Sequence, residues 1–101
     1  MLKKFVIERD IKGVGSFPQS ELGGASRTSN EALAKLKGIQ WQHSYRTADK
    51  TFCIYLAESE DLIRQHAEIS GFPANQITEV VDVFDPSTEK HCPLVAAKAN
   101  S

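Results

Sequence analysis

The sequence predicts one α+β domain whose elements follow the order β-α-β-β-α-β. Three observations lead to this prediction. Four short segments are rich in β-branched and aromatic residues, two longer segments carry apolar residues at helical spacing, and turn-forming residues separate them. A chain of 101 residues is long enough for a single hydrophobic core.

The first strand and the first helix are expected in the N-terminal third of the chain. Residues 2–9 are rich in bulky apolar side chains, which is typical of a central strand. A helix is expected over residues 18–36, because Pro18 suits a first helical turn and Gly38 suits a terminator. A pair of glycines early in this segment leaves open a later start. The stripe expected to face the sheet consists of Leu22, Ala25, Ser29, Ala32, Leu33 and Leu36.

A hairpin, a second helix and a last strand are expected in the rest of the domain. The hairpin joins residues 39–47 to residues 51–57 through a polar turn. Ser59 is a suitable N-cap for the second helix, and Gly71 is a suitable residue to end it. The last strand is expected over residues 76–84.

This order of elements is that of the ferredoxin-like fold, an antiparallel sheet with two helices on one face. The third strand is apolar on both of its faces, and helices on one side leave one of these faces uncovered. We therefore expect a homodimer in which the sheets of two copies pack together. The side chains concerned are Phe52, Ile54 and Leu56 on one face and Cys53 and Tyr55 on the other.

Charge and composition exclude several classes of protein. A net charge of -1 provides no basic surface field, so neither nucleic acid nor a membrane is an expected partner. We expect a cytoplasmic protein, because the apolar runs are too short to span a bilayer and no signal-peptide pattern is present. The two cysteines lack C-x-x-C spacing, so we expect both to be reduced thiols. Glu8, Arg9 and Asp10, at a strand end, are expected to form surface ion pairs. We place the domain at residues 1–86 and a C-terminal tail at residues 87–101.

Four segments of the chain resemble those of one known family, in the same order. They are residues 5–11, 39–45, 49–55 and 63–73, which include the sequences FVIERDI, IQWQHSY and DKTFCIY. The family is a small bacterial ferredoxin-like family, once catalogued as a domain of unknown function, that includes an actinobacterial nickel-binding protein. The resemblance implies a dimeric α+β barrel and, for at least one member, nickel held near the dimer surface. No ligand is carried over residue by residue.

Two histidines are the leading candidates for metal binding. Alternation along the hairpin places Trp41, His43 and Tyr45 on one face. His66 falls on the apolar stripe of the second helix, so both histidines are expected to point into the layer between helix and sheet. Their imidazoles suit nickel, zinc, copper or iron, with Cys53 as a third candidate ligand. Candidate pocket or supporting residues are Trp41, Tyr45, Tyr55 and Glu8, and candidate tail ligands are His91 and Cys92.

The length of the hairpin turn decides which side chains meet His43. A turn of three residues places Tyr55 across from His43 and Cys53 across from Tyr45, whereas two or four residues move Cys53 to the other face. The spacing of the candidates matches no fixed metal motif. The alternative for each histidine is a structural role, with the ring held by a tyrosine hydroxyl or a backbone carbonyl.

The predicted function is binding of a divalent transition metal, with nickel first, for sequestration or sensing. The alternative is a small dimeric α+β barrel enzyme, monooxygenase- or isomerase-like, or a ligand-binding protein that uses the cleft between helices and sheet. In the enzyme, His43 or His66 would act as general base, and Trp41 and the tyrosines would line the pocket. A third interpretation is an interaction module in which both histidines are structural.

Overall fold

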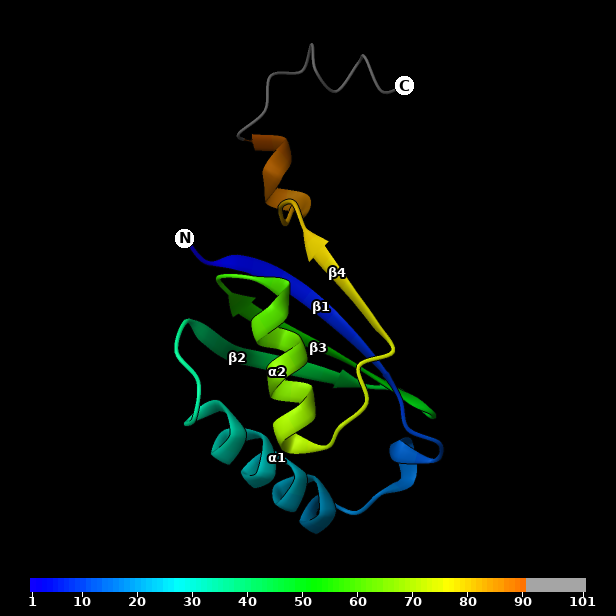
Figure 1. Cartoon of the computed structure of the whole chain (residues 1–101). Helices are drawn as coiled ribbons and strands as arrows, with labels where there is room; N and C mark the ends of the chain where they lie inside the picture. The colour runs from blue at the N-terminus through cyan, green and yellow to red at the C-terminus, as the bar shows by residue number, and fades with distance from the viewer. Residues whose placement is uncertain (91–101) are drawn as a thin grey trace.

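The computed structural model describes residues 1–90 and has the predicted order of strands and helices (Figure 1). The candidate tail ligands His91 and Cys92 lie outside the described residues. Within residues 1–90, no helix is long and apolar enough to cross a bilayer. The elements are β1 (Lys3–Asp10), the 3-10 turn η1 (Val14–Ser16), α1 (Gln19–Leu33), β2 (Ile39–Arg46), β3 (Lys50–Ala57), α2 (Glu60–Ser70), β4 (Gln76–Val80) and the 3-10 turn η2 (Pro86–Lys90).

The four strands form one antiparallel sheet in the order β2-β3-β1-β4, with the helices on one side of it (Figure 1). Both helices pack on the face that carries Tyr55 of β3. The Tyr55 ring centroid lies 5.3 Å from that of His66 on α2, and the Tyr55 hydroxyl lies 3.4 Å from the Ser29 hydroxyl on α1. This architecture is consistent with the predicted ferredoxin-like fold.

Helix α2 begins and ends where its capping residues predict. The Ser59 hydroxyl accepts a hydrogen bond from the Leu62 amide at 3.4 Å, and Gly71 ends the helix with a φ of 81°. Helix α1 ends at Leu33, earlier than expected, because the amides of Lys35 and Leu36 bond to carbonyls three residues back in a tighter turn.

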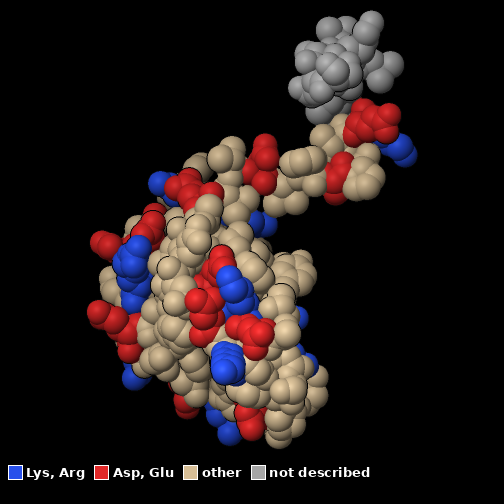
Figure 2. All heavy atoms as spheres, turned by 90° about the vertical axis from the view of Figure 1, so that its right-hand side faces the viewer, with Lys and Arg blue, Asp and Glu red and all other residues tan. Residues whose placement is uncertain are grey.

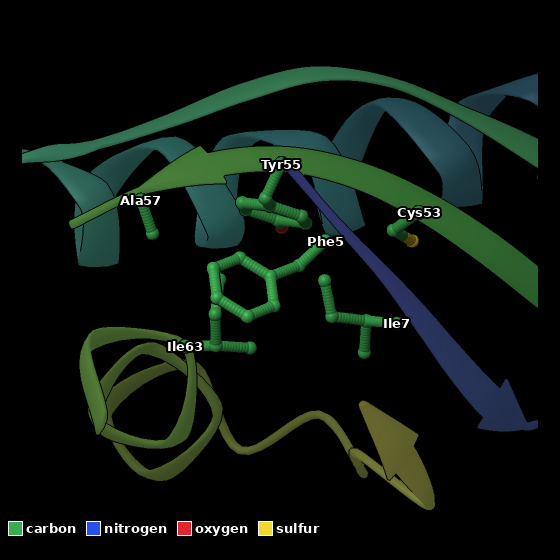
Figure 3. Packing of buried hydrophobic residues seen from close by; sticks show 6 residues of the cluster. All are labelled: Phe5, Ile7, Cys53, Tyr55, Ala57 and Ile63. Carbon is green, nitrogen blue, oxygen red and sulfur yellow. The ribbon is translucent and has the colours of Figure 1, made fainter. Parts of the chain in front are cut away.

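The hydrophobic core lies between the sheet and the two helices. Phe5 and Ile7 of β1 project toward Ile63 of α2, and Tyr55 of β3 lies beside them (Figure 3). Alternation along β1 and β3 sends every second side chain into this layer. The buried cluster consists of Phe5, Ile7, Cys53, Tyr55, Ala57 and Ile63.

The opposite side of the sheet, called the open face below, is also apolar. Val6 of β1 lies directly across from Ile54 of β3, and both alternate with core residues. These side chains are only half-buried, and neither helix covers them because both helices pack on the other face. The apolar side chains of the open face are Val6, Phe52, Ile54, Leu56 and Val80.

The chain leaves the sheet at Val80, so the prediction of a strand continuing to residue 84 is wrong. Val80 pairs with Lys4 near the start of β1, which leaves almost no further strand to pair with. Residues 81–90 extend away from the sheet as an arm (Figures 1 and 2). Val81 and Phe84 in this arm are 95% and 80% exposed, which is unusual for large apolar side chains.

Acidic and basic side chains are interspersed over the face in Figure 2.

The η1 turn packs against the β2–β3 turn through Gly15. The Gly15 amide donates to the Ala48 carbonyl at 2.9 Å, and a Cβ at Gly15 would lie 2.7 Å from the Ala48 Cα and 2.8 Å from the Thr47 carbonyl oxygen. Both neighbours are backbone atoms, so the two turns would have to move apart to admit a methyl group.

Gly15→Ala is therefore expected to lower the free energy of unfolding by about 1–3 kcal/mol through overpacking. The matched control is Gly23→Ala within α1, where an added Cβ meets nothing within 4 Å. That control should raise the free energy of unfolding by about 0.5–1 kcal/mol, because alanine favours the helix over glycine. Urea denaturation measures both, and equal effects of the two substitutions would contradict the close turn–turn contact.

Candidate functional site

The side chains of β2 divide between the two faces of the sheet. Trp41 lies across from Tyr55 on the helix face, whereas His43 lies across from Ile54 on the open face. A register shift between Trp41 and His43 separates them, because a β-bulge adds one residue and reverses the alternation. The prediction that Trp41, His43 and Tyr45 share one face is therefore wrong.

The turn of the hairpin contributes to the same result. Arg46 pairs with Thr51, and the Thr47 amide donates to the Lys50 carbonyl at 2.8 Å, which leaves a turn of two residues rather than three. Ser44, not Tyr45, therefore lies across from Cys53. Tyr45 lies across from Phe52 on the open face.

His43 is accessible on the open face. Its Nε2 lies 3.1 Å from the Tyr45 hydroxyl, and the two rings meet edge to face at a centroid distance of 5.1 Å. Both side chains are exposed to solvent. An exposed imidazole beside a phenol can accept a metal ion from solution without unfolding any part of the chain.

His66 is enclosed on the helix face. Its side chain is fully buried, and its Nε2 lies 3.1 Å from the Ser29 hydroxyl and 3.3 Å from the Ser29 carbonyl oxygen. Among residues 1–90, the buried Nδ1 of His66 has no hydrogen-bond partner. Burial lowers the pKa of His66, the positive charge of Arg9 lowers it further, and the bond to the Ser29 carbonyl opposes both. His66 is therefore a neutral core residue. The prediction that His66 faces His43 is wrong.

Tyr55 links this buried polar group to the cavity described below. Its ring stacks on Trp41 with a centroid distance of 6.5 Å and an interplanar angle of 18°. Its hydroxyl lies near the Ser29 hydroxyl, which in turn contacts His66. Burial raises the pKa of the Tyr55 phenol, so the hydroxyl stays protonated and available as a hydrogen-bond donor.

The structure does not bring His43, His66 and Cys53 together within one chain. His43 lies on the open face, whereas Cys53 is buried on the helix face with its thiol 3.7 Å from the Thr51 hydroxyl. Glu8 is held by Lys50 in an ion pair on the surface. In the part of the chain that the structure describes, no three His, Cys, Asp or Glu side chains lie close enough to hold one metal ion. Metal binding by any of them stays a prediction.

A cavity of about 340 Å³ lies between α1, the sheet and the loops at one end of it. Neither His43 nor His66 lines it, so the prediction that a histidine faces this cleft as a general base is wrong. Of the predicted pocket residues, Trp41 and Tyr55 line the cavity, whereas Tyr45 and Glu8 do not. The remaining lining residues are Arg9, Ile11, Val14, Phe17, Glu21, Leu22, Ala25, Ser26, Ser29, Ser44, Thr51, Cys53, Phe72 and Pro73.

Arg9 lines this cavity, so the prediction that it forms a surface ion pair is wrong. Its side chain is only 3% exposed. Its Nη1 donates to the Pro73 carbonyl at 2.5 Å, and its guanidinium carbon lies 6.0 Å from the centre of the Phe72 ring. The signal was present in the sequence, because Arg9 continues the alternation that turns Phe5 and Ile7 inward.

Comparisons with known proteins agree with the fold. A family model described as "Nickel responsive protein SCO4226-like" matches residues 5–80. Among solved structures, the chain is similar to SCO4226 from Streptomyces coelicolor A3(2), with a TM-score of 0.68 and 17% sequence identity. The similarity covers 80% of this chain and 99% of that chain. No curated protein matches the chain.

The buried neutral His66 should make stability depend on pH. Its pKa is lowered from 6.5 in the folded state, so below that pH the unfolded chain binds a proton that the folded chain does not. The free energy of unfolding should therefore fall as the pH drops below 6.5, and His66→Gln should reduce this fall.

Urea denaturation over a pH series measures the effect, with His43→Gln on the exposed open face as the control. The control should follow the wild type. A His66→Gln variant with the same pH dependence as the wild type would show that His66 is not held neutral by the fold.

Proposed function

Because the chain belongs to the SCO4226-like family of nickel-responsive proteins, we propose that it binds a divalent transition metal, with nickel as the first candidate, for sequestration or sensing. The observation that carries the proposal is the exposed imidazole of His43 beside the Tyr45 hydroxyl on the open face. Imidazole suits nickel as a ligand, and the other described histidine, His66, is enclosed in the core.

One imidazole does not make a metal site, so further ligands must come from elsewhere. Metal sites that hold their ion firmly supply several protein ligands. We propose that a second copy of the chain packs on the open face and adds its own donors near His43. His91 and Cys92, outside the described residues, are the other candidate source of ligands.

The apolar character of the open face supports the proposed homodimer. Phe52, Ile54 and Leu56 form a continuous row along β3, and Val6 lies beside them on β1. Each of these side chains remains partly in water in a single chain. Packing two such faces together would remove this apolar surface from water, and the exposed side chains of the arm, such as Phe84, could bury against the partner as well.

The cavity favours a second candidate function, binding of a small molecule. Its volume of about 340 Å³ lies within the range of ligand sites, and its lining includes the aromatic residues Phe17, Trp41, Tyr55 and Phe72. Since neither described histidine reaches it, the cavity supports binding rather than base catalysis by histidine. This site lies on the helix face and is separate from His43.

Calorimetric titration with nickel tests the metal proposal. Wild-type protein should bind nickel saturably, and His43→Ala should weaken the affinity by more than about tenfold because an imidazole ligand is lost. His66→Gln serves as the matched control, because it removes a buried histidine and should leave the affinity unchanged.

Two outcomes would contradict the proposal. Binding that survives in His43→Ala would move the site away from the open face, toward His91 and Cys92. A wild-type protein that binds no nickel would remove the nickel assignment altogether.

Sedimentation equilibrium tests the proposed dimer. Ile54→Lys places a charge in the centre of the open face and should convert a dimer into a folded monomer, because an unpaired charge would be buried at the interface. Ile69→Lys, on the solvent-exposed side of α2, is the control and should remain dimeric. A monomeric wild type, or a dimer unaffected by Ile54→Lys, would argue against pairing through this face.

A further inference from the structure

Arg9 places a positive charge inside an otherwise largely apolar cavity. The side chain is 3% exposed and lines the cavity from β1. Burying a charged group is costly unless an opposite charge or several hydrogen bonds compensate for it. A buried cation at the wall of a cavity therefore needs a partner that accounts for its position.

The described residues compensate the buried charge of Arg9 only in part. The ion pairs within residues 1–90 join Lys50 to Glu8 and Asp10, and Arg64 to Glu60, so none of them involves Arg9. The guanidinium has five N–H donors, of which Nη1 donates one to the Pro73 carbonyl, and the guanidinium also lies near enough to the Tyr55 hydroxyl to interact with it. The face of the Phe72 ring adds a weak cation–π contact. Donors remain for an anion that enters the cavity.

The lining of the cavity indicates the shape of such an anion. Trp41 and Tyr55 stack on each other, and Phe72, beside Arg9, lines the same cavity. Flat aromatic walls favour a flat aromatic ligand, because ring contacts bury a large area with little loss of conformational freedom. The Ser29 and Tyr55 hydroxyls offer additional hydrogen bonds.

The charge balance of the cavity indicates a single negative charge. Glu21, in the first turn of α1, is the carboxylate among the lining residues, and it is exposed to solvent. It is not paired with Arg9 in any ion pair of the described residues. Its negative charge would oppose a second anionic group on the ligand, whereas one carboxylate can meet the Arg9 fork directly.

We propose that this cavity binds a small aromatic monocarboxylate, with the carboxylate on Arg9 and the ring against the aromatic side chains of Trp41, Tyr55 and Phe72. The inference rests on the second candidate function, small-molecule binding in the cavity. It is independent of metal binding at His43, which lies on the other face of the sheet.

Trp41 provides a direct readout, because it is the single tryptophan of the chain and it lines the cavity. The full chain would be titrated with benzoate, phenylacetate and 3-phenylpropanoate, and with the neutral amide of each, while Trp41 fluorescence is followed. At least one acid should bind about tenfold or more tightly than its amide, because the amide has the same shape but cannot form a charge-assisted pair.

Three variants assign this preference to Arg9. Arg9→Gln should abolish the difference between acid and amide, and Arg9→Lys should retain only part of it because lysine lacks the planar fork. Arg27→Gln, on the exposed surface of α1 and outside the cavity, should bind as the wild type does. If Arg9→Gln does not fold, the preference for acid over amide is compared between the wild type and Arg9→Lys. A smaller preference in Arg9→Lys supports recognition of the carboxylate by Arg9, and an equal one contradicts it.

The failures of the inference and of the cavity function are distinguishable. Equal binding of acid and amide would keep small-molecule binding in the cavity and overturn anion recognition by Arg9. An acid preference that persists in Arg9→Gln would also overturn it. No change in Trp41 fluorescence with any of the acids or amides would overturn both the inference and the second candidate function.

Discussion

The β-bulge in β2 is the feature on which the functional organisation of this domain depends. It adds one residue between Trp41 and His43, so these two side chains leave the sheet on opposite faces. Trp41 stacks on Tyr55 and closes one side of the cavity, whereas His43 is presented to solvent beside Tyr45. With the same two-residue turn, a regular strand would leave His43 on the open face but place Trp41 across from Leu56 on that face, away from the cavity. The bulge thereby separates the proposed metal ligand from the proposed ligand pocket.

The helix face uses its polar groups in two ways. Ser29 of α1 contacts both the Tyr55 hydroxyl and His66, which joins α1, β3 and α2 through one small polar cluster inside the core. Hydrogen bonds of this kind add little net stability but are costly to break once buried. Arg9 differs from this cluster, because its guanidinium borders a cavity and takes part in no ion pair of the described residues. The fold alone explains the cluster of Ser29, Tyr55 and His66. The position of Arg9 is explained by the ligand proposed for the cavity.

Local signals were sufficient to predict the elements, but not the faces of the hairpin. The N-cap at Ser59 and the terminator at Gly71 act within a few residues, so α2 was predicted closely. Whether His43 shares a face with Cys53 depends on the length of the turn, and whether it shares one with Trp41 depends on one inserted residue. The end of β4 depends on where its partner strand β1 begins. The residues of β4 themselves carry no information about that position. Arg9 could have been placed by alternation, but its charge suggested the surface.

The separation of His43 from His66 can be measured directly by adding nickel to isotope-labelled protein and following its amide NMR spectrum. A paramagnetic ion broadens the signals of nearby residues. If the metal binds on the open face, broadening should begin at His43, Tyr45 and Ile54, while the amides of Ser29 and His66 remain sharp. Broadening centred on His66 would contradict the division of the two faces, and broadening confined to His91 and Cys92 would show that the tail holds the metal instead.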